Sequence, residues 1–149
     1  MFNDEELKIF ADGYTKNDFS MIECDSQDPF ANYDFRIALS EFAVKNIDTV
    51  NTDLIADLFL ENAKSSKHTF SVYNKLNVLA QKLLTHDWKK YLDVYMEGAR
   101  MSFDTALATG NIKLDVQKAS EIYKYVVGLP EPEKHELFIM RFQHLMTIS

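Results

Sequence analysis

Three carboxylates, Asp53, Asp57 and Glu61, recur at intervals of four residues. In an α-helix this spacing places all three on one face, and like charges there disfavour the helix by about 0.2–0.5 kcal/mol per pair. We interpret the stripe as an acidic ridge that faces water and binds a basic partner. A plain solvated face and a catalytic carboxylate pair are the alternatives. Catalysis needs one carboxylate removed from water, which a ridge of this kind does not provide.

The single cysteine, Cys24, is the second group that could do chemistry. It lies among Glu23, Asp25 and Asp28, and negative neighbours raise the pKa of a thiol and suppress the reactive thiolate. We therefore expect Cys24 to fill space and not to act as a nucleophile. One cysteine also rules out an internal disulfide and a cysteine-based zinc cluster.

Other chemical motifs are missing from the sequence. It contains no glycine-rich phosphate loop, no GxSxG and no HExxH. Of the four histidines, only His135 is paired at helical spacing with a carboxylate, Glu131, and the Glu-x-x-His pattern of a di-iron bundle does not occur. The sequence therefore predicts no catalytic residues, no metal site and no cofactor.

The net charge of −7 is divided unevenly along the chain. Residues 1–61 hold fourteen acids and four bases, whereas residues 62–149 hold nine acids and twelve bases. Residues 64–90 alone carry six lysines against Asp87. The acidic balance repels nucleic acid and anionic membranes. The basic stretch lacks the arginines and aromatics of nucleic-acid modules, so a solvated face is its simplest reading, and we expect no nucleic-acid partner.

Apolar residues recur with helical spacing along most of the chain. The start and stop patterns predict helices at 4–12, 35–46, 53–64, 70–85, 88–109, 116–127 and 132–146. Four glycines and three prolines are too few for the turns of an all-β protein. We predict an all-α fold, an irregular antiparallel bundle of six to seven helices in a single domain, 1–149. An α-solenoid is the alternative, although no residue pattern repeats at a fixed period.

Residues 14–34 are the one long stretch without helical spacing. Residues 25–29 carry turn-forming residues, and a strand at 19–24 stays open as an alternative. We expect this segment to be extended, to wrap the helices and to bury its aromatic side chains. In the helix at 88–109 we expect a buried Trp88, and close packing or a bend at Gly98.

The N-terminus, MFNDEELKIF, lacks the basic and apolar regions of a secretory signal. No run of 18 apolar residues occurs that would span a bilayer. We expect a cytoplasmic protein with no membrane partner.

These observations favour a small acidic protein without enzymatic activity that binds another protein. Immunity and antitoxin proteins, which block basic toxins, share this composition, although no motif carries that analogy. One alternative is a helical enzyme or ligand binder whose pocket joins residues distant in sequence. Another is a homo-oligomer in which the acidic half contacts the basic stretch of a neighbour. If the ridge faces water, neutralising Asp53, Asp57 and Glu61 leaves folding intact or improves it slightly.

Overall fold

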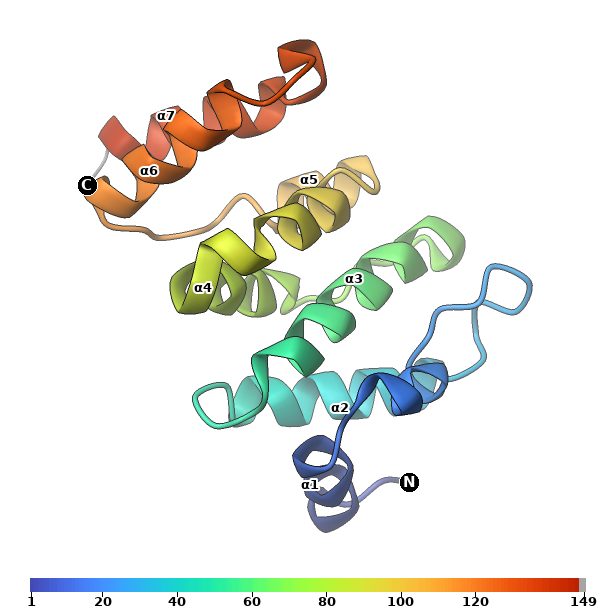
Figure 1. Cartoon of the computed structure of the whole chain (residues 1–149). Coiled ribbons are helices and arrows are strands. Elements are labelled where there is room, and N and C mark those ends of the chain that lie inside the picture. The colour runs from blue at the N-terminus through green and yellow to red at the C-terminus, as the bar shows by residue number, and fades with distance from the viewer. Residues whose placement is uncertain (148–149) are drawn as a thin grey trace. The chain divides into compact units, whose positions relative to one another are not determined.

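A computed structural model describes residues 1–147, which contain helices, turns and loops but no strand, so the predicted all-α fold is confirmed (Figure 1). The chain divides into two compact units, Met1–Asn111 and Ile112–Ser149. That the chain folds as a single domain stays a prediction. None of the helices among the described residues is long and apolar enough to cross a membrane.

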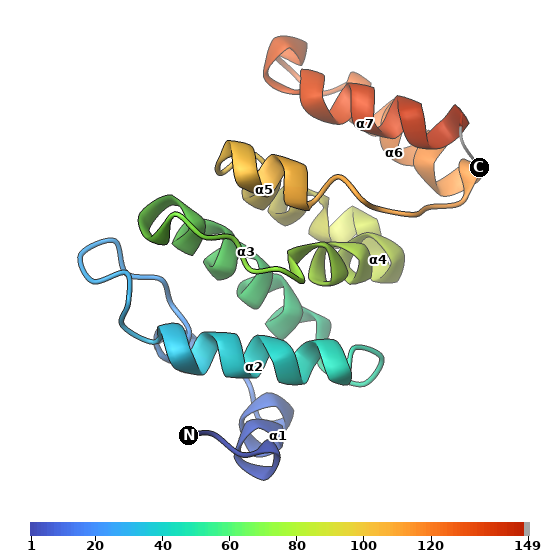
Figure 2. The same ribbon diagram turned by 180° about the vertical axis from the view of Figure 1, so that it is seen from behind.

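The first unit is organised around one central helix, α3 (Thr52–Thr69). This helix contacts α2 (Tyr33–Lys45), α4 (Leu76–Ala99) and α5 (Phe103–Ala108), and α1 (Asp4–Asp12) packs on α2 (Figures 1 and 2). Most of the apolar side chains of α3 have no exposed surface: Leu54, Ile55, Leu58, Phe59 and Ala63. A helix that touches neighbours on most of its sides has little surface left for water.

The helix starts follow the expected capping chemistry in part. The Asn3 side chain accepts a hydrogen bond from the Glu6 backbone N–H at 2.8 Å and begins α1, as predicted. Asn51 caps α3 by accepting from the Asp53 N–H at 2.7 Å. The helix α3 runs on to Thr69, and the prediction of a helix at 70–85 is wrong in its start because α4 begins at Leu76.

The predicted break before Trp88 is present as a kink within α4, where Asp87 leaves the helical conformation (φ −161°, ψ 81°). The predicted continuation to residue 109 is wrong, because α4 ends at Ala99 and α5 begins separately. Ser102 caps α5 with a reciprocal pair of hydrogen bonds to Thr105, so a separate helix begins at Phe103. Trp88 is partly exposed rather than buried.

Residues 14–34 form no strand and no simple extended segment. Lys16–Met21 is a 3-10 helix, η1, and turns follow it up to α2. Tyr14 and Ile22 are buried, as we expected of this segment's apolar side chains. Phe30 is 65% exposed, so the expectation that the segment buries its aromatic side chains is wrong at this residue.

The second unit is a helical hairpin. In it α6 (Val116–Val127) packs on α7 (Glu136–Thr147) (Figure 2). The connection between the two helices contains the short 3-10 helix η2 (Pro132–Lys134). The bounds of α6 match the prediction, and Asp115 caps it by accepting from the Lys118 N–H at 2.7 Å. The predicted helix 132–146 is interrupted at His135, because the proline-led turn is a 3-10 helix that ends there.

Gly98 marks the closest approach between α3 and α4. A Cβ atom at this position would lie 2.3 Å from Cε2 of Phe59, whose ring is in turn stacked on Tyr95 with centroids 6.3 Å apart. The helix needs a glycine here because the Phe59 ring occupies the place of a side chain. Close packing at Gly98, one of the two predicted explanations for this glycine, is confirmed.

Gly98→Ala is expected to lower the free energy of unfolding by about 1–2 kcal/mol, because overpacking outweighs the gain in helix propensity. Gly13→Ala is the matched control, since its Cβ meets only Ile9 O at an ordinary 3.5 Å. Urea denaturation of both variants measures the difference. Equal stability of Gly98→Ala and wild type would contradict the packing, and adding Phe59→Leu to Gly98→Ala should restore part of the loss.

Candidate functional site

Asp53, at the start of α3, is bonded to the second half of α4. The Tyr91 hydroxyl donates to Oδ1 at 2.6 Å, and Lys90 Nζ lies 3.1 Å from the same oxygen. These hydrogen bonds, with that from Tyr91 the larger cause, lower the pKa of Asp53 below its usual 3.8. Burial, followed by the hydrogen bond to Asp53, raises the pKa of Tyr91. The carboxylate therefore ties the first turn of α3 to α4.

Asp57, one turn further along α3, is bonded to the segment that follows α1. Lys16 Nζ lies 2.6 Å from both carboxylate oxygens, and the Tyr14 hydroxyl donates to Oδ2 at 2.7 Å. Burial, with the hydrogen bond to Asp57 as the next cause, raises the pKa of Tyr14 well above its usual 10. Asp57 thus fixes residues 14–16 against the middle of α3.

Glu61, the third carboxylate, is buried with an exposed fraction of 1%. Its Oε1 accepts a hydrogen bond from the backbone N–H of Cys24 at 3.0 Å, and its Oε2 lies 3.0 Å from Lys64 Nζ. A buried carboxylate is tolerated only when it is paired and hydrogen-bonded in this way. Glu61 therefore anchors the chain at Cys24.

The expectation that Asp53, Asp57 and Glu61 form a ridge facing water is wrong for Glu61, which is buried, and for Asp57, whose side chain is only 13% exposed. The Asp53 side chain is about half exposed, as the prediction requires. The three side chains do share one face of α3, as their spacing predicts, but each one is bonded to a different segment. Their donors come from 37–43 residues away in sequence, except for the neighbouring Lys64. The stripe is an internal seam that holds the first unit together.

Arg36, on α2, is a buried cation that sequence reasoning missed. It has no exposed surface; its Nη1 donates to Ile22 O at 3.1 Å, while Nε and Nη2 have no hydrogen-bond partner. Burial lowers the pKa of the guanidinium, and the charges of Cys24 and Glu61 oppose that shift. A long cation in this position fixes Ile22 and lies in the electrostatic field of the Glu61 anchor.

Residues 22–32 form a loop closed at its base, which we call the acidic loop. Asn32 Nδ2 donates to Ser20 O at 2.9 Å and to Glu23 O at 3.2 Å, so the two ends of the loop meet. Asn32 takes a left-handed conformation (φ 64°), which asparagine tolerates better than most residues. With Arg36 and Glu61 holding Ile22 and Cys24, the base is fixed from both sides. Closed surface loops of this size are frequently functional.

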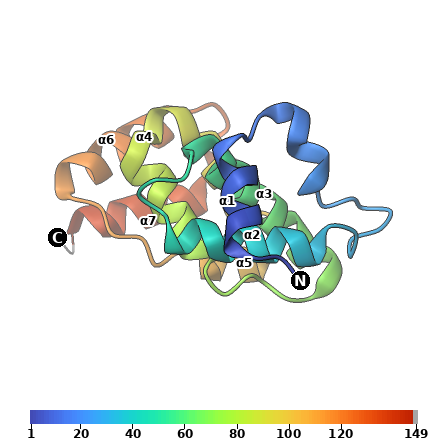
Figure 3. The ribbon, with the colours of Figure 1, turned by 90° about the horizontal axis from the view of Figure 1, so that it is seen from below.

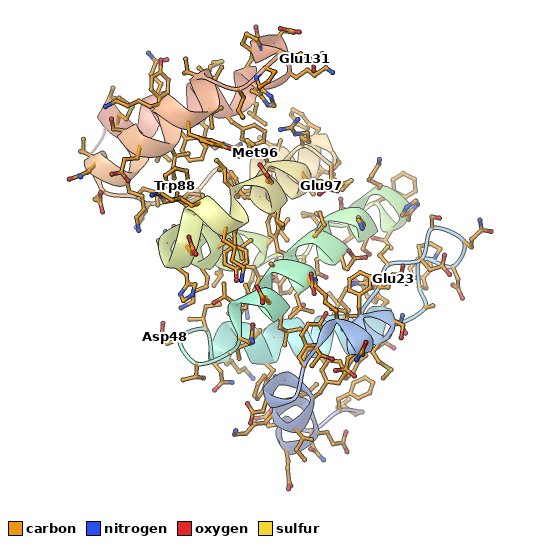
Figure 4. The ribbon with its side chains drawn as sticks, viewed as in Figure 1. Glu23, Asp48, Trp88, Met96, Glu97 and Glu131 are labelled. Carbon is orange, nitrogen blue, oxygen red and sulfur yellow. The ribbon has the colours of Figure 1, made fainter. Side chains whose placement is uncertain are left out.

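The acidic loop extends beyond the start of α2, as Figures 1 and 3 show from two directions. It carries Glu23, Asp25 and Asp28, and Glu23 is labelled on it in Figure 4. All three side chains are exposed, and none of the ion pairs among residues 1–147 involves them. Phe30 is exposed on the same loop, in ring contact with Tyr33 at a centroid distance of 6.1 Å. The loop therefore presents uncompensated negative charge beside an aromatic ring.

The chemistry of the other candidates is limited. Cys24 is buried, and burial is the largest cause of its raised pKa, with the Arg36 charge opposing it. Within the part of the chain that the structure describes, no three histidine, cysteine or carboxylate side chains converge on a possible metal position. An open hollow of about 440 Å³ between α1 and the end of α2 is lined by Asp4, Lys8 and Asp12 together with Phe42 and Val50. Lys8 is already paired there with Asp12.

Comparison with known proteins adds no family. No protein-family model, no curated protein and no solved structure matches the chain significantly.

Sequence reasoning missed the donors of the seam and the buried Arg36. A pattern for Arg36 exists in hindsight: Arg36, Ser40 and Ala43 share one helical face, and the structure buries all three. Ser40 accepts from Asn62 Nδ2 at 2.8 Å, which adds a polar contact between α2 and α3. Nothing in the local sequence of Tyr14, Lys16 or Tyr91 shows that each would contact α3.

Glu61→Gln is expected to lower the free energy of unfolding by about 1–3 kcal/mol, because two charge-assisted contacts of a buried group are weakened. Glu97→Gln, the same chemical change on the exposed face of α4 (Figure 4), is the control and should stay within about 0.5 kcal/mol of wild type. Urea denaturation compares the two. If both variants change the free energy of unfolding equally, Glu61 faces water and is not buried and bonded as described.

Asp53 is expected to make stability depend on acid pH. Because its folded-state pKa is lowered, the stabilisation is complete above the unfolded value near 3.8 and is lost as pH falls through the lower folded value. The difference in unfolding free energy between wild type and Asp53→Asn should therefore be constant at neutral pH and shrink below about pH 4. Urea denaturation at a series of pH values measures this difference. If it stays the same down to about pH 2, the bonds from Tyr91 and Lys90 do not favour the charged carboxylate.

Proposed function

We propose that this chain is a binding protein without enzymatic activity, and that its acidic loop contacts a partner protein with a basic surface. The observation that carries the proposal is the closed loop at residues 22–32, whose carboxylates pair with no cation of residues 1–147, while those on α3 do. Exposed charge of one sign accelerates association with an oppositely charged partner. A loop already held in one conformation also loses less entropy on binding.

The surroundings of the loop have the same character. Residues 1–34 hold nine acids and two lysines, and both lysines are already paired, Lys8 with Asp12 and Lys16 with Asp57. Phe30 and Met21 supply exposed apolar surface between the charges. Aromatic side chains and methionine are enriched at the centres of protein interfaces, where they slow dissociation. In the proposed interface, the charges thus speed association and the apolar contacts slow dissociation.

The prediction that Asp53, Asp57 and Glu61 bind the partner is kept only in a narrower form. Asp53 is about half exposed and stays accessible to a partner, whereas Glu61 is enclosed. We propose that Glu61 acts by holding the acidic loop in place, while Asp57 and Asp53 hold residues 14–16 and α4 against α3. Inhibition of a basic toxin, as by an immunity or antitoxin protein in the cytoplasm, is the particular form of binding that the composition favours.

The test compares three versions of the full chain as bait in the native cell extract. The loop variant is Glu23→Gln/Asp25→Asn/Asp28→Asn. Its control, Asp93→Asn/Glu97→Gln/Glu121→Gln, removes the same three charges from exposed positions elsewhere. Wild type and control should retain the same basic protein, and the loop variant should lose it. Stopped-flow association of the purified partner should be slowed, with a flatter salt dependence, by the loop variant alone.

Equal retention by all three baits would refute the acidic loop as the contact surface. So would a partner whose association rate falls to the same extent in the loop variant and in the control, because net charge and not the loop would then decide the rate.

A further inference from the structure

A second surface of the first unit combines apolar and basic side chains. Phe70, which ends α3, is 91% exposed, and Phe103, which begins α5, is 77% exposed. The Ser66 and Ser102 hydroxyl oxygens are 3.3 Å apart, so the end of α3 and the start of α5 are neighbours, as Figures 1 and 2 show. We call this surface, formed by Phe70, Phe103 and the exposed Leu107 one turn along α5, the aromatic patch.

Phe70 is held in an unusual position for its residue type. Its backbone is left-handed (φ 56°), a conformation that costs a bulky residue energy and that glycine adopts freely. Neither burial nor a ring contact of the described residues offsets that cost. Large exposed apolar surface of this kind marks a contact site.

The patch is bordered by positive charge. Lys67, one turn before Phe70, is exposed and belongs to none of the ion pairs among residues 1–147, and His68 follows it. Residues 62–86 contain no acid at all. Asp104, beside Phe103, is the one carboxylate of α5. The occupant that fits this surface carries negative charge together with apolar side chains.

We propose that the occupant is the acidic loop of a second copy of this chain. The loop has the complementary chemistry: Glu23 and Asp28 can face Lys67 and His68. Phe30, together with Met21 just before the loop, can cover Phe70 and Phe103. Loop and patch also lie on the same unit. Glu61, which anchors the loop, and Phe70 are nine residues apart on α3, a rise of about 14 Å. A surface with two complementary halves is self-complementary under a two-fold axis, so each copy covers the loop of the other.

This inference goes beyond the proposed function and adds a competition to it. The loop covered by a second copy is not available to a basic partner, so partner binding and self-association exclude each other on that loop. The two proposals fail separately. A monomeric protein can still lose its captured partner when the loop is neutralised, and a dimer can form in the absence of any partner.

The test is a charge exchange between two variants of the full chain, followed by sedimentation velocity at about 0.05 M and 0.3 M salt. The patch variant is Lys67→Glu/His68→Glu, and the loop variant is Glu23→Lys/Asp28→Lys. Wild type should dimerise, more weakly at high salt. Each variant alone should dimerise at least about tenfold more weakly, since like charges then face each other. An equimolar mixture should recover the dimer, because both loop-to-patch contacts again join opposite charges.

Two further variants serve as a charge control and as a test of the apolar contact. Lys45→Glu, at the far end of α2 from the loop, should leave dimerisation unchanged. Phe70→Gly removes the exposed ring and suits the left-handed backbone, so it should fold normally and dimerise more weakly. The proposal is overturned by a wild type that stays monomeric at low salt. It is equally overturned by single variants that dimerise like wild type, or by a mixture that stays monomeric.

Discussion

A carboxylate enclosed in protein must be paired where it is buried, and Glu61 meets this constraint by bonding to the backbone of Cys24 and to Lys64. The consequence extends well beyond one side chain. Because Cys24 is fixed, Ile22 reaches the guanidinium of Arg36, and Asn32 can close the loop between them. Asp57 and Asp53 repeat the same arrangement along α3, toward the N-terminal segment and toward α4. One helix face therefore determines where three separate segments lie.

The helix bounds that were predicted well from the sequence are those set by local hydrogen bonds. The caps Asn3 and Asp115 act within three residues of themselves, and the bounds of α1 and α6 follow from them. The early end of α4 also has a local cause, the Ser102–Thr105 capping pair, but the continuing apolar period concealed it. The seam on α3 was not predictable in the same way. Repulsion between like charges is a local effect, whereas Tyr14, Lys16 and Tyr91 reach the helix only through the tertiary fold.

The acids of α3 and those of the acidic loop thus have different physical roles. Those on α3 are bonded within the chain, and their removal would affect stability first. Those on the acidic loop take part in none of the ion pairs among residues 1–147 and remain open to an external cation. The aromatic patch exposes apolar side chains as the loop does, but it is bordered by basic and not by acidic residues. Composition alone does not separate these groups, because a buried Glu61 and an exposed Glu23 count equally in the net charge.

The central claim is that Glu61 holds the acidic loop in place through the backbone of Cys24. Amide hydrogen exchange at Cys24, followed by NMR in wild type and in Glu61→Gln, tests this most directly. We predict that the Cys24 amide of wild type exchanges as slowly as amides in the middle of α3. In Glu61→Gln it should exchange much faster, while the α3 amides keep most of their protection. A Cys24 amide that already exchanges rapidly in wild type would contradict the account.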